Sequence, residues 1–145
     1  MTCSRPNAAA ATVLLSIFVL IVGAMPSLAA NLRYECDITK RQKNVQWISP
    51  QLIVDIPQKG QPQVFDAVIQ HFIGKPVPAR ATKRGADLVV RWSLKGLRDS
   101  AKQAIPAFNF TARINTETNA VRLMAKPTSF PNQWTGRGTC KLRNR

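Results

Sequence analysis

Apolar and polar residues alternate along most of this chain, and this period of two limits the folds that it can adopt. The clearest run is 88–95, where Leu88, Val90, Trp92 and Leu94 alternate with one valine and three polar residues. Six more segments alternate in the same way, at 32–39, 52–56, 77–82, 108–115, 121–126 and 134–142. Gly and Pro residues separate them, as expected between strands. The pattern predicts an all-β fold, either a sandwich or a small antiparallel barrel of lipocalin-like type.

Two segments leave the choice of secondary structure open. Apolar residues between Phe65 and Ile73 follow the spacing of one helical face, yet the same segment read as a strand is apolar on both faces. We therefore expect at most one short helix near 64–73. Residues 97–105 are either a second short helix or a polar loop.

Turns and glycines give further local expectations. Residues 115–119 have the composition of a hairpin loop between two strong strands. Gly136 and Gly138 fall on the same strand face as Cys140. Glycine at such positions allows a bend or a close approach of another backbone, as at the corner of a barrel.

The first thirty residues have the order of a secretory signal peptide. Arg5 precedes an uncharged stretch at 8–30 with a strongly apolar centre, and small residues follow Pro26. The small residues place the cleavage site after Ala29, or less favourably after Ala30. An uncleaved anchor is the alternative, because the uncharged stretch is long enough to span a bilayer.

The domain organisation follows from this reading. We predict a signal peptide at 1–30 and a single exported β domain at 31–145, in the periplasm or secreted. No second apolar run of membrane length occurs in the mature part. The sequence leaves the oligomeric state open.

Two cysteines remain after removal of the signal peptide, Cys36 and Cys140. An even count in an exported chain predicts a disulfide between them, which would bring the first and last strands together. A metal or redox pair is the alternative. However, there is no C-x-x-C spacing, and His71 is the only histidine in the chain.

The charge balance is the strongest indication of function. The chain has 21 basic and 7 acidic residues, a net charge of +14 to which Arg5 of the signal peptide contributes one. Such a field attracts polyanions and anionic membrane surfaces, although a basic surface can also be incidental. The sequence contains no specific nucleic-acid-binding motif. The candidate anion-binding residues are Arg80, Lys83, Arg84, Arg91, Arg137, Lys141 and Arg143.

Two further arginines flank the predicted hairpin loop. Arg113 and Arg122 lie on either side of 115–119, so we expect them on neighbouring strands.

Catalytic patterns are missing from the sequence. No nucleophile elbow, zinc-protease motif, P-loop or dinucleotide fingerprint occurs, and the acidic residues are scattered. His71 and Asp66 are five residues apart, so they share neither a strand face nor a helix face. We expect a protein that is not an enzyme and has no metal or cofactor. Trp92 and Trp134 are expected in the core.

Three short segments carry a resemblance. They are Tyr34-Glu35-Cys36, Gly74-Lys75-Pro76, and the run from Asn132 to Cys140 with the sequence NQWTGRGTC. In these segments the chain resembles a set of small exported proteins of Gram-negative bacteria without known activity. The resemblance implies the β fold and the disulfide, and it implies no activity.

The Y-x-C start and the late cysteine also resemble those of periplasmic lysozyme inhibitors. Their S-G-x-x-Y loop is missing, because Tyr34 is the only tyrosine. A basic protein would moreover repel lysozymes, which are generally basic.

Three hypotheses of function follow, in order. The first is a non-enzymatic binding protein for an anionic envelope or extracellular partner. The second is a calycin-like barrel that binds a small apolar ligand in a space left between Trp92, Phe108, Phe110 and Trp134. The third is a small hydrolase with carboxylates near His71.

Overall fold

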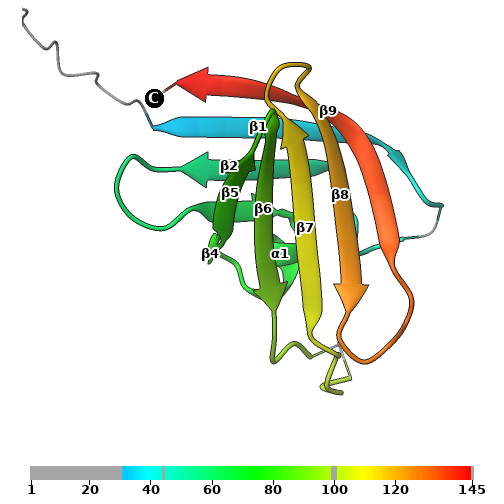
Figure 1. The fold of residues 1–145 in the computed structure, drawn as a ribbon. Coiled ribbons are helices and arrows are strands. Elements are labelled where there is room, and N and C mark those ends of the chain that lie inside the picture. Colours follow the sequence, from blue (N-terminus) through cyan, green and yellow to red (C-terminus); the bar gives the residue numbers. More distant parts are fainter. Residues whose placement is uncertain (1–30, 44, 99–100, 145) are drawn as a thin grey trace, which may run out of the picture.

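The computed structural model describes residues 31–43, 45–98 and 101–144, so the predicted signal peptide lies outside the described residues. Within these ranges, nine strands form one antiparallel sheet in the order β4-β3-β2-β1-β9-β8-β7-β6-β5, which curls into a nearly closed barrel (Figure 1). The all-β prediction is confirmed, and of the two predicted architectures, a sandwich or a small antiparallel barrel, the structure has the barrel, with one short helix. No described residue belongs to a helix long and apolar enough to cross a membrane. The elements are β1 (Leu32–Arg41), β2 (Gln51–Ile56), β3 (Gln63–Asp66), α1 (Ala67–Phe72), β4 (Val77–Pro78), β5 (Arg80–Arg84), β6 (Asp87–Leu94), β7 (Phe108–Asn115), β8 (Ala120–Pro127) and β9 (Trp134–Asn144).

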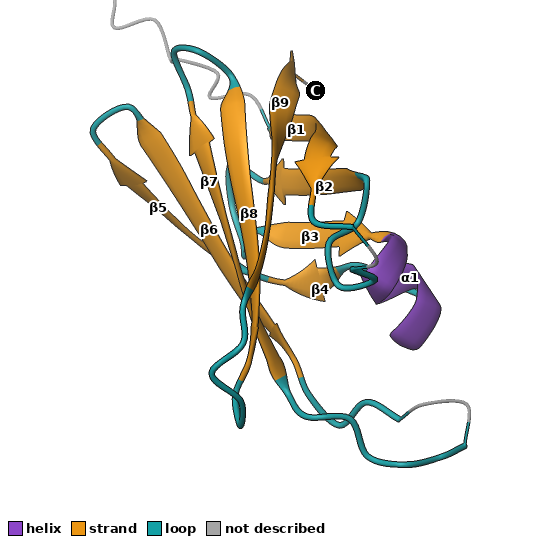
Figure 2. Ribbon diagram, turned by 90° about the vertical axis from the view of Figure 1, so that its right-hand side faces the viewer, coloured by secondary structure: helices purple, strands orange, loops and turns teal. Residues whose placement is uncertain are grey.

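The two halves of the sheet cross at a large angle. Figure 2 shows β5 to β8 running steeply while β1 to β4 lie nearly across them, with the long β9 between the two sets. The inward residues of both halves meet in one core, as the alternation predicted; they include Leu52 and Val54 of β2 and Phe110, Ala112 and Ile114 of β7. Most outward residues of β5 to β9 are polar; the exceptions include Val89, which is buried, and Met124, which is half-buried.

The two edges of the sheet meet along a seam, and one chain segment crosses from one edge to the other. The predicted strand at 77–82 is divided at Ala79, where the chain passes from β4 at one edge of the sheet to β5 at the other. Ala79 is buried, and its backbone N–H donates to the carbonyl of Pro62 at 2.8 Å. Because β4 has only two residues, the two edges approach each other without a full ladder between them.

The predicted disulfide is confirmed. Cys36 of β1 and Cys140 of β9 are direct partners in the ladder and are bonded to each other across 104 positions of sequence. The first and last strands therefore lie side by side (Figure 1). This bond fixes together the two segments of the barrel that are most distant along the chain.

A corner lies beside the disulfide. The β1–β9 register shifts between Asp37 and Lys40, as in a β-bulge. A Cβ at Gly138 would overlap the backbone carbonyl of Asp37, and one at Gly136 would come within 2.7 Å of an Ile48 methyl carbon. Both glycines therefore permit the close backbone approach that the sequence predicted.

The ambiguous segment at 64–73 is a strand followed by a helix. β3 ends at Asp66, whose carboxylate Oδ1 accepts from the Ile69 N–H at 2.7 Å and so caps α1. In the other ambiguous segment, the described part of 97–105 is a loop with one bridge between Arg98 and Ala104. The predicted hairpin loop at 115–119 joins β7 to β8.

Candidate anion-binding surface

Six of the seven candidate cations lie on the outer face of β5 to β9, and two of these six, Lys141 and Arg143, are near the end of β9. Arg91 of β6 and Arg137 of β9 alternate with buried or half-buried residues, and the β5–β6 ladder places Arg80 and Arg84 of β5 on the same face as Arg91; all four are exposed. The outer face of this half of the sheet therefore carries most of the predicted set. Lys83 is exposed, but it alternates with Arg84 and so belongs to the other face of β5.

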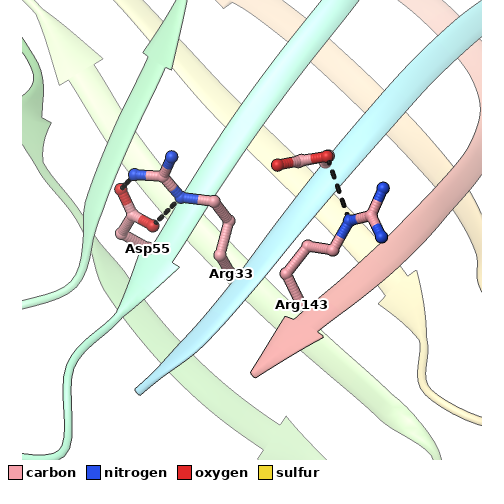
Figure 3. Close-up of polar contacts among 4 residues, drawn as sticks. Arg33, Asp55 and Arg143 are labelled. Carbon is pink, nitrogen blue, oxygen red and sulfur yellow. Dashed lines mark hydrogen bonds and ion pairs between the residues drawn. The ribbon is translucent and has the colours of Figure 1, made fainter. Parts of the chain in front are cut away.

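Lys141 and Arg143, near the end of β9, are close to acidic residues. Lys141 is paired with Glu35 in the ladder, and Arg143 Nε lies 3.4 Å from a carboxylate oxygen of Glu35. Beside them, Arg33 forms a two-point ion pair with Asp55, and this hydrogen-bonded contact raises the pKa of Arg33 (Figure 3). The cations in this region are thus partly neutralised, which makes them weaker candidates for an external anion.

The ladder aligns a different set of cations on the outer face. Arg113 of β7 pairs with Arg122 of β8, Arg122 pairs with Arg137 of β9, and Arg137 pairs with Lys40 of β1. All four residues are exposed, and they cross four adjacent strands in one line. We call these four residues the basic row. At a strand spacing of about 4.8 Å, the row is about 14 Å long at the backbone.

Few acidic side chains neutralise the positive charges of the basic row. Of the ion pairs formed by the described residues, only one involves the row, between Arg113 Nη1 and Asp87 Oδ2 at 3.7 Å. Asp37 pairs with Thr139, two residues beyond Arg137 on the same strand, and forms no such ion pair. Directly opposed like charges destabilise a sheet, so the row costs stability that a bound anion would restore.

The Arg113–Arg122 pair of the basic row could be predicted from the sequence, but the positions of Arg137 and Lys40 beside it could not. A loop at 115–119 pairs Ile114 with Val121 and therefore places Arg113 opposite Arg122, as observed. The register of β8 with β9 and of β9 with β1 depends on a longer loop and on the bulge. For that reason the sequence alone does not indicate that Arg137 lies opposite Arg122 and Lys40.

A separate groove lies at one side of the barrel, between α1 and the segment before β2. It has a volume of about 350 Å³, and its walls include the rings of Trp47 and Phe72, which stack with centroids 5.6 Å apart. His71 lies at this groove and contacts Phe72 edge-on, with ring centroids 4.6 Å apart. His71 is exposed.

The barrel interior is occupied by aromatic rings. Trp92 and Phe110 are buried and stack 5.2 Å apart, and Phe108 contacts both Phe110 and Trp134. Trp92 is in the core as predicted, whereas Trp134 is only partly buried and packs against the core.

Asp66, near the groove, is the one acidic residue that is buried among those described. Burial raises its pKa to about 6, against hydrogen bonds from the Ile69 and Val68 backbone that lower it. Its Oδ2 has no hydrogen-bond partner in the described part of the chain. Over the same residues, no three His, Cys, Asp or Glu side chains gather as they would around a metal ion.

No protein-family model, curated protein or solved structure matches this chain. The resemblance to small exported proteins of Gram-negative bacteria therefore stays a prediction.

Proposed function

We propose that this protein is a non-enzymatic binding protein whose partner is a linear polyanion of the cell envelope or the extracellular space. The observation that carries the proposal is the basic row, in which Arg113, Arg122, Arg137 and Lys40 lie opposite one another on four adjacent strands. A line of evenly spaced cations matches a chain of regularly spaced anionic groups better than it matches a single small anion.

The surroundings of the row favour a polar chain over a lipid surface. The next positions on the same outer face are Thr111, Met124 and Thr135, all partly buried, with no aromatic side chain among them. Proteins that bind at membrane interfaces usually insert exposed aromatic or bulky apolar residues, whereas the one bulky apolar side chain at these positions, Met124, is partly buried. Base-stacking aromatics are likewise missing from these positions, which argues against a single-stranded nucleic acid.

The disulfide supports an exported location, periplasmic or secreted. Bonds of this kind persist in oxidising compartments and are rare in the cytosol. Acidic polysaccharides are present outside the cell, where such a protein could meet them.

The test is binding of the oxidised protein to heparin, used as a probe polyanion. Contacts to four charges predict an affinity loss of roughly 100-fold between about 50 and about 200 mM salt, with binding still measurable at the upper value. Charge reversal by Arg122→Glu or Arg137→Glu should weaken binding strongly and flatten the salt dependence. Lys83→Glu is the matched control, because it makes the same charge change away from the row.

Two results would overturn the proposal. One is an equal loss of affinity in the Lys83→Glu variant, which would mean that only net charge matters. The other is tighter binding to anionic vesicles than to heparin at the upper salt concentration, which would identify a membrane surface as the partner.

A second candidate function is binding of a small apolar ligand, and the groove beside α1 is the observation that favours it. Because aromatic rings occupy the interior, we place such a ligand at Trp47 and Phe72, outside the barrel proper. An apolar fluorescent dye that binds the wild type but not a Trp47→Ala variant would support this candidate. Failure of the dye to bind either protein would reject it.

A further inference from the structure

The barrel is open along one short seam, next to the point where the chain crosses from β4 to β5. β5 begins at Arg80, which is the partner of Arg91, but β6 continues to Leu94. The last three residues of β6 therefore have no partner on β5. A cleft of about 390 Å³ lies here, and we call it the seam cleft; its walls include Arg80, Arg91, Ser93, Asn109 and Thr111.

Two guanidinium groups belong to the seam cleft. Arg80 and Arg91 are direct partners on adjacent strands, so their positive charges are opposed across the β5–β6 ladder. Neither residue takes part in an ion pair of the described residues. Two unneutralised arginines side by side supply the charge of a dianion and the paired N–H groups that bind phosphate oxygens.

Neutral donors line the same cleft. The Ser93 hydroxyl donates to Asn109 Oδ1 at 2.6 Å, which leaves both N–H bonds of the Asn109 amide for another acceptor. The Thr111 hydroxyl adds a further polar group at the wall. These groups can bind the oxygen atoms of a polar molecule attached to the anion.

Trp92 lies on the opposite face of β6 from Arg91 and Ser93. The residue is only 4% exposed, it stacks on Phe110 in the barrel interior, and its buried Nε1–H has no hydrogen-bond partner in the described part of the chain. The indole N–H is therefore out of reach of a ligand in the seam cleft, and the polar groups of the cleft are those of the outer face.

We propose that the seam cleft binds a phosphate monoester of a small polar molecule, such as a phosphorylated sugar or glycerol. Arg80 and Arg91 bind the phosphate dianion, and Asn109 and Thr111 bind oxygen atoms of the ligand. A carboxylate has one negative charge and neutralises only one of the two arginines, so it should bind more weakly. This site uses none of the residues of the basic row, so it stands independently of the polyanion proposal.

The test is nuclear magnetic resonance titration of the oxidised, 15N-labelled protein with glycerol phosphate. The side-chain amide signals of Asn and Gln are followed, and those of Asn109 are assigned by their loss in an Asn109→Asp variant. The expected result is a saturable shift of the Asn109 signals while those of Gln42 and Gln58, which do not line the cleft, stay in place. Sodium chloride at equal ionic strength controls for salt, and glucuronate tests the carboxylate.

Substitutions locate the site. Arg80→Gln and Arg91→Gln should each weaken glycerol phosphate binding roughly tenfold or more, because each removes a charge-assisted hydrogen-bonding group. Arg84→Gln is the matched control, since Arg84 is also exposed on β5 but does not line the cleft. Thermal melts of every variant show whether it is folded.

Three outcomes would overturn the proposal: no saturable shift of the Asn109 amide signals, the same shift with sodium chloride, or equal weakening by Arg84→Gln. An Arg122→Glu variant that still binds glycerol phosphate but not heparin would separate this site from the basic row. Loss of heparin binding alone therefore bears only on the polyanion proposal.

Discussion

Replacing Arg122 with glutamate should stabilise the protein while it weakens polyanion binding. Arg122 is at the centre of the basic row, with Arg113 opposite it on one side and Arg137 on the other. The substitution removes two like-charge contacts and creates two opposite-charge contacts at the same positions. If Arg122 had only a structural role, its replacement should instead destabilise the protein.

The size of the effect follows from cross-strand pair energies. Each such charge pair contributes about 0.2–1 kcal/mol, and four terms change in the same direction. Because all three side chains are exposed, values near the lower end apply, which gives a gain of about 1–2 kcal/mol in the free energy of unfolding. For a domain of this size, the melting temperature should rise by about 4–8 °C.

The assay is thermal and urea unfolding of the oxidised protein at low salt, paired with the heparin titration. An Arg122→Gln variant removes the repulsion without adding attraction, so its gain should be about half as large. Lys83→Glu should leave stability nearly unchanged, because the ladder partner of Lys83 is the apolar Leu88. High salt should reduce all of these differences by screening.

A decrease in stability on Arg122→Glu, or a gain that high salt leaves intact, would refute the reasoning. The first result would mean that the row is not under electrostatic repulsion. The second would mean that some effect other than charge, such as a change in packing, stabilises the variant.

Three further predictions concern the fold. The pKa of Asp66 is raised to about 6 from an ordinary value near 3.8, so ionisation of Asp66 lowers the stability of the folded protein as pH rises from about 4 to about 6. The loss amounts to about 3 kcal/mol, and an Asp66→Asn variant should not show it. The measurement is urea unfolding of both proteins from pH 4 to 7. Gly138→Ala should destabilise by about 3 kcal/mol or prevent folding, because its Cβ would overlap backbone. Gly136→Ala meets the side chains of Ile38 and Ile48 and not backbone, so it should cost less in the same urea assay. Reduction of the Cys36–Cys140 bond should lower the free energy of unfolding by about 4–5 kcal/mol, and an equal melting temperature with and without reductant would contradict this.

Local pattern in the sequence was enough to predict most of the strands. The alternation at 88–95 and at 108–115 places one face of each strand in the core whatever its neighbours are, because side chains in a strand point to opposite faces in turn. The hairpin loop at 115–119 also fixes its own register. The helix at 67–72 remained open, since its apolar spacing fits a buried strand as well.

The two cysteines and two glycines predicted contacts between segments that are far apart in the sequence. Cys36 and Cys140 could pair only if the first and last strands meet, and the described barrel has them as ladder partners. Gly136 and Gly138 share their strand face with Cys140, and the corner lies there because no side chain occupies the space that the β1 backbone needs. These residues constrain the fold through covalent and steric requirements that hold in any arrangement.

The tertiary structure alone decided which charges act together. Arg122, Arg137 and Lys40 are far apart in sequence, and only the β8–β9 and β1–β9 registers, with a bulge in β1, bring them into line. The seam cleft likewise depends on the change of sheet edge at Ala79, which separates the end of β6 from β5. Alternation and turn residues determine which face of a strand is buried, but charged side chains on the solvent face do not specify their cross-strand neighbours. Those neighbours follow from the closure of the barrel, which is a property of the whole chain.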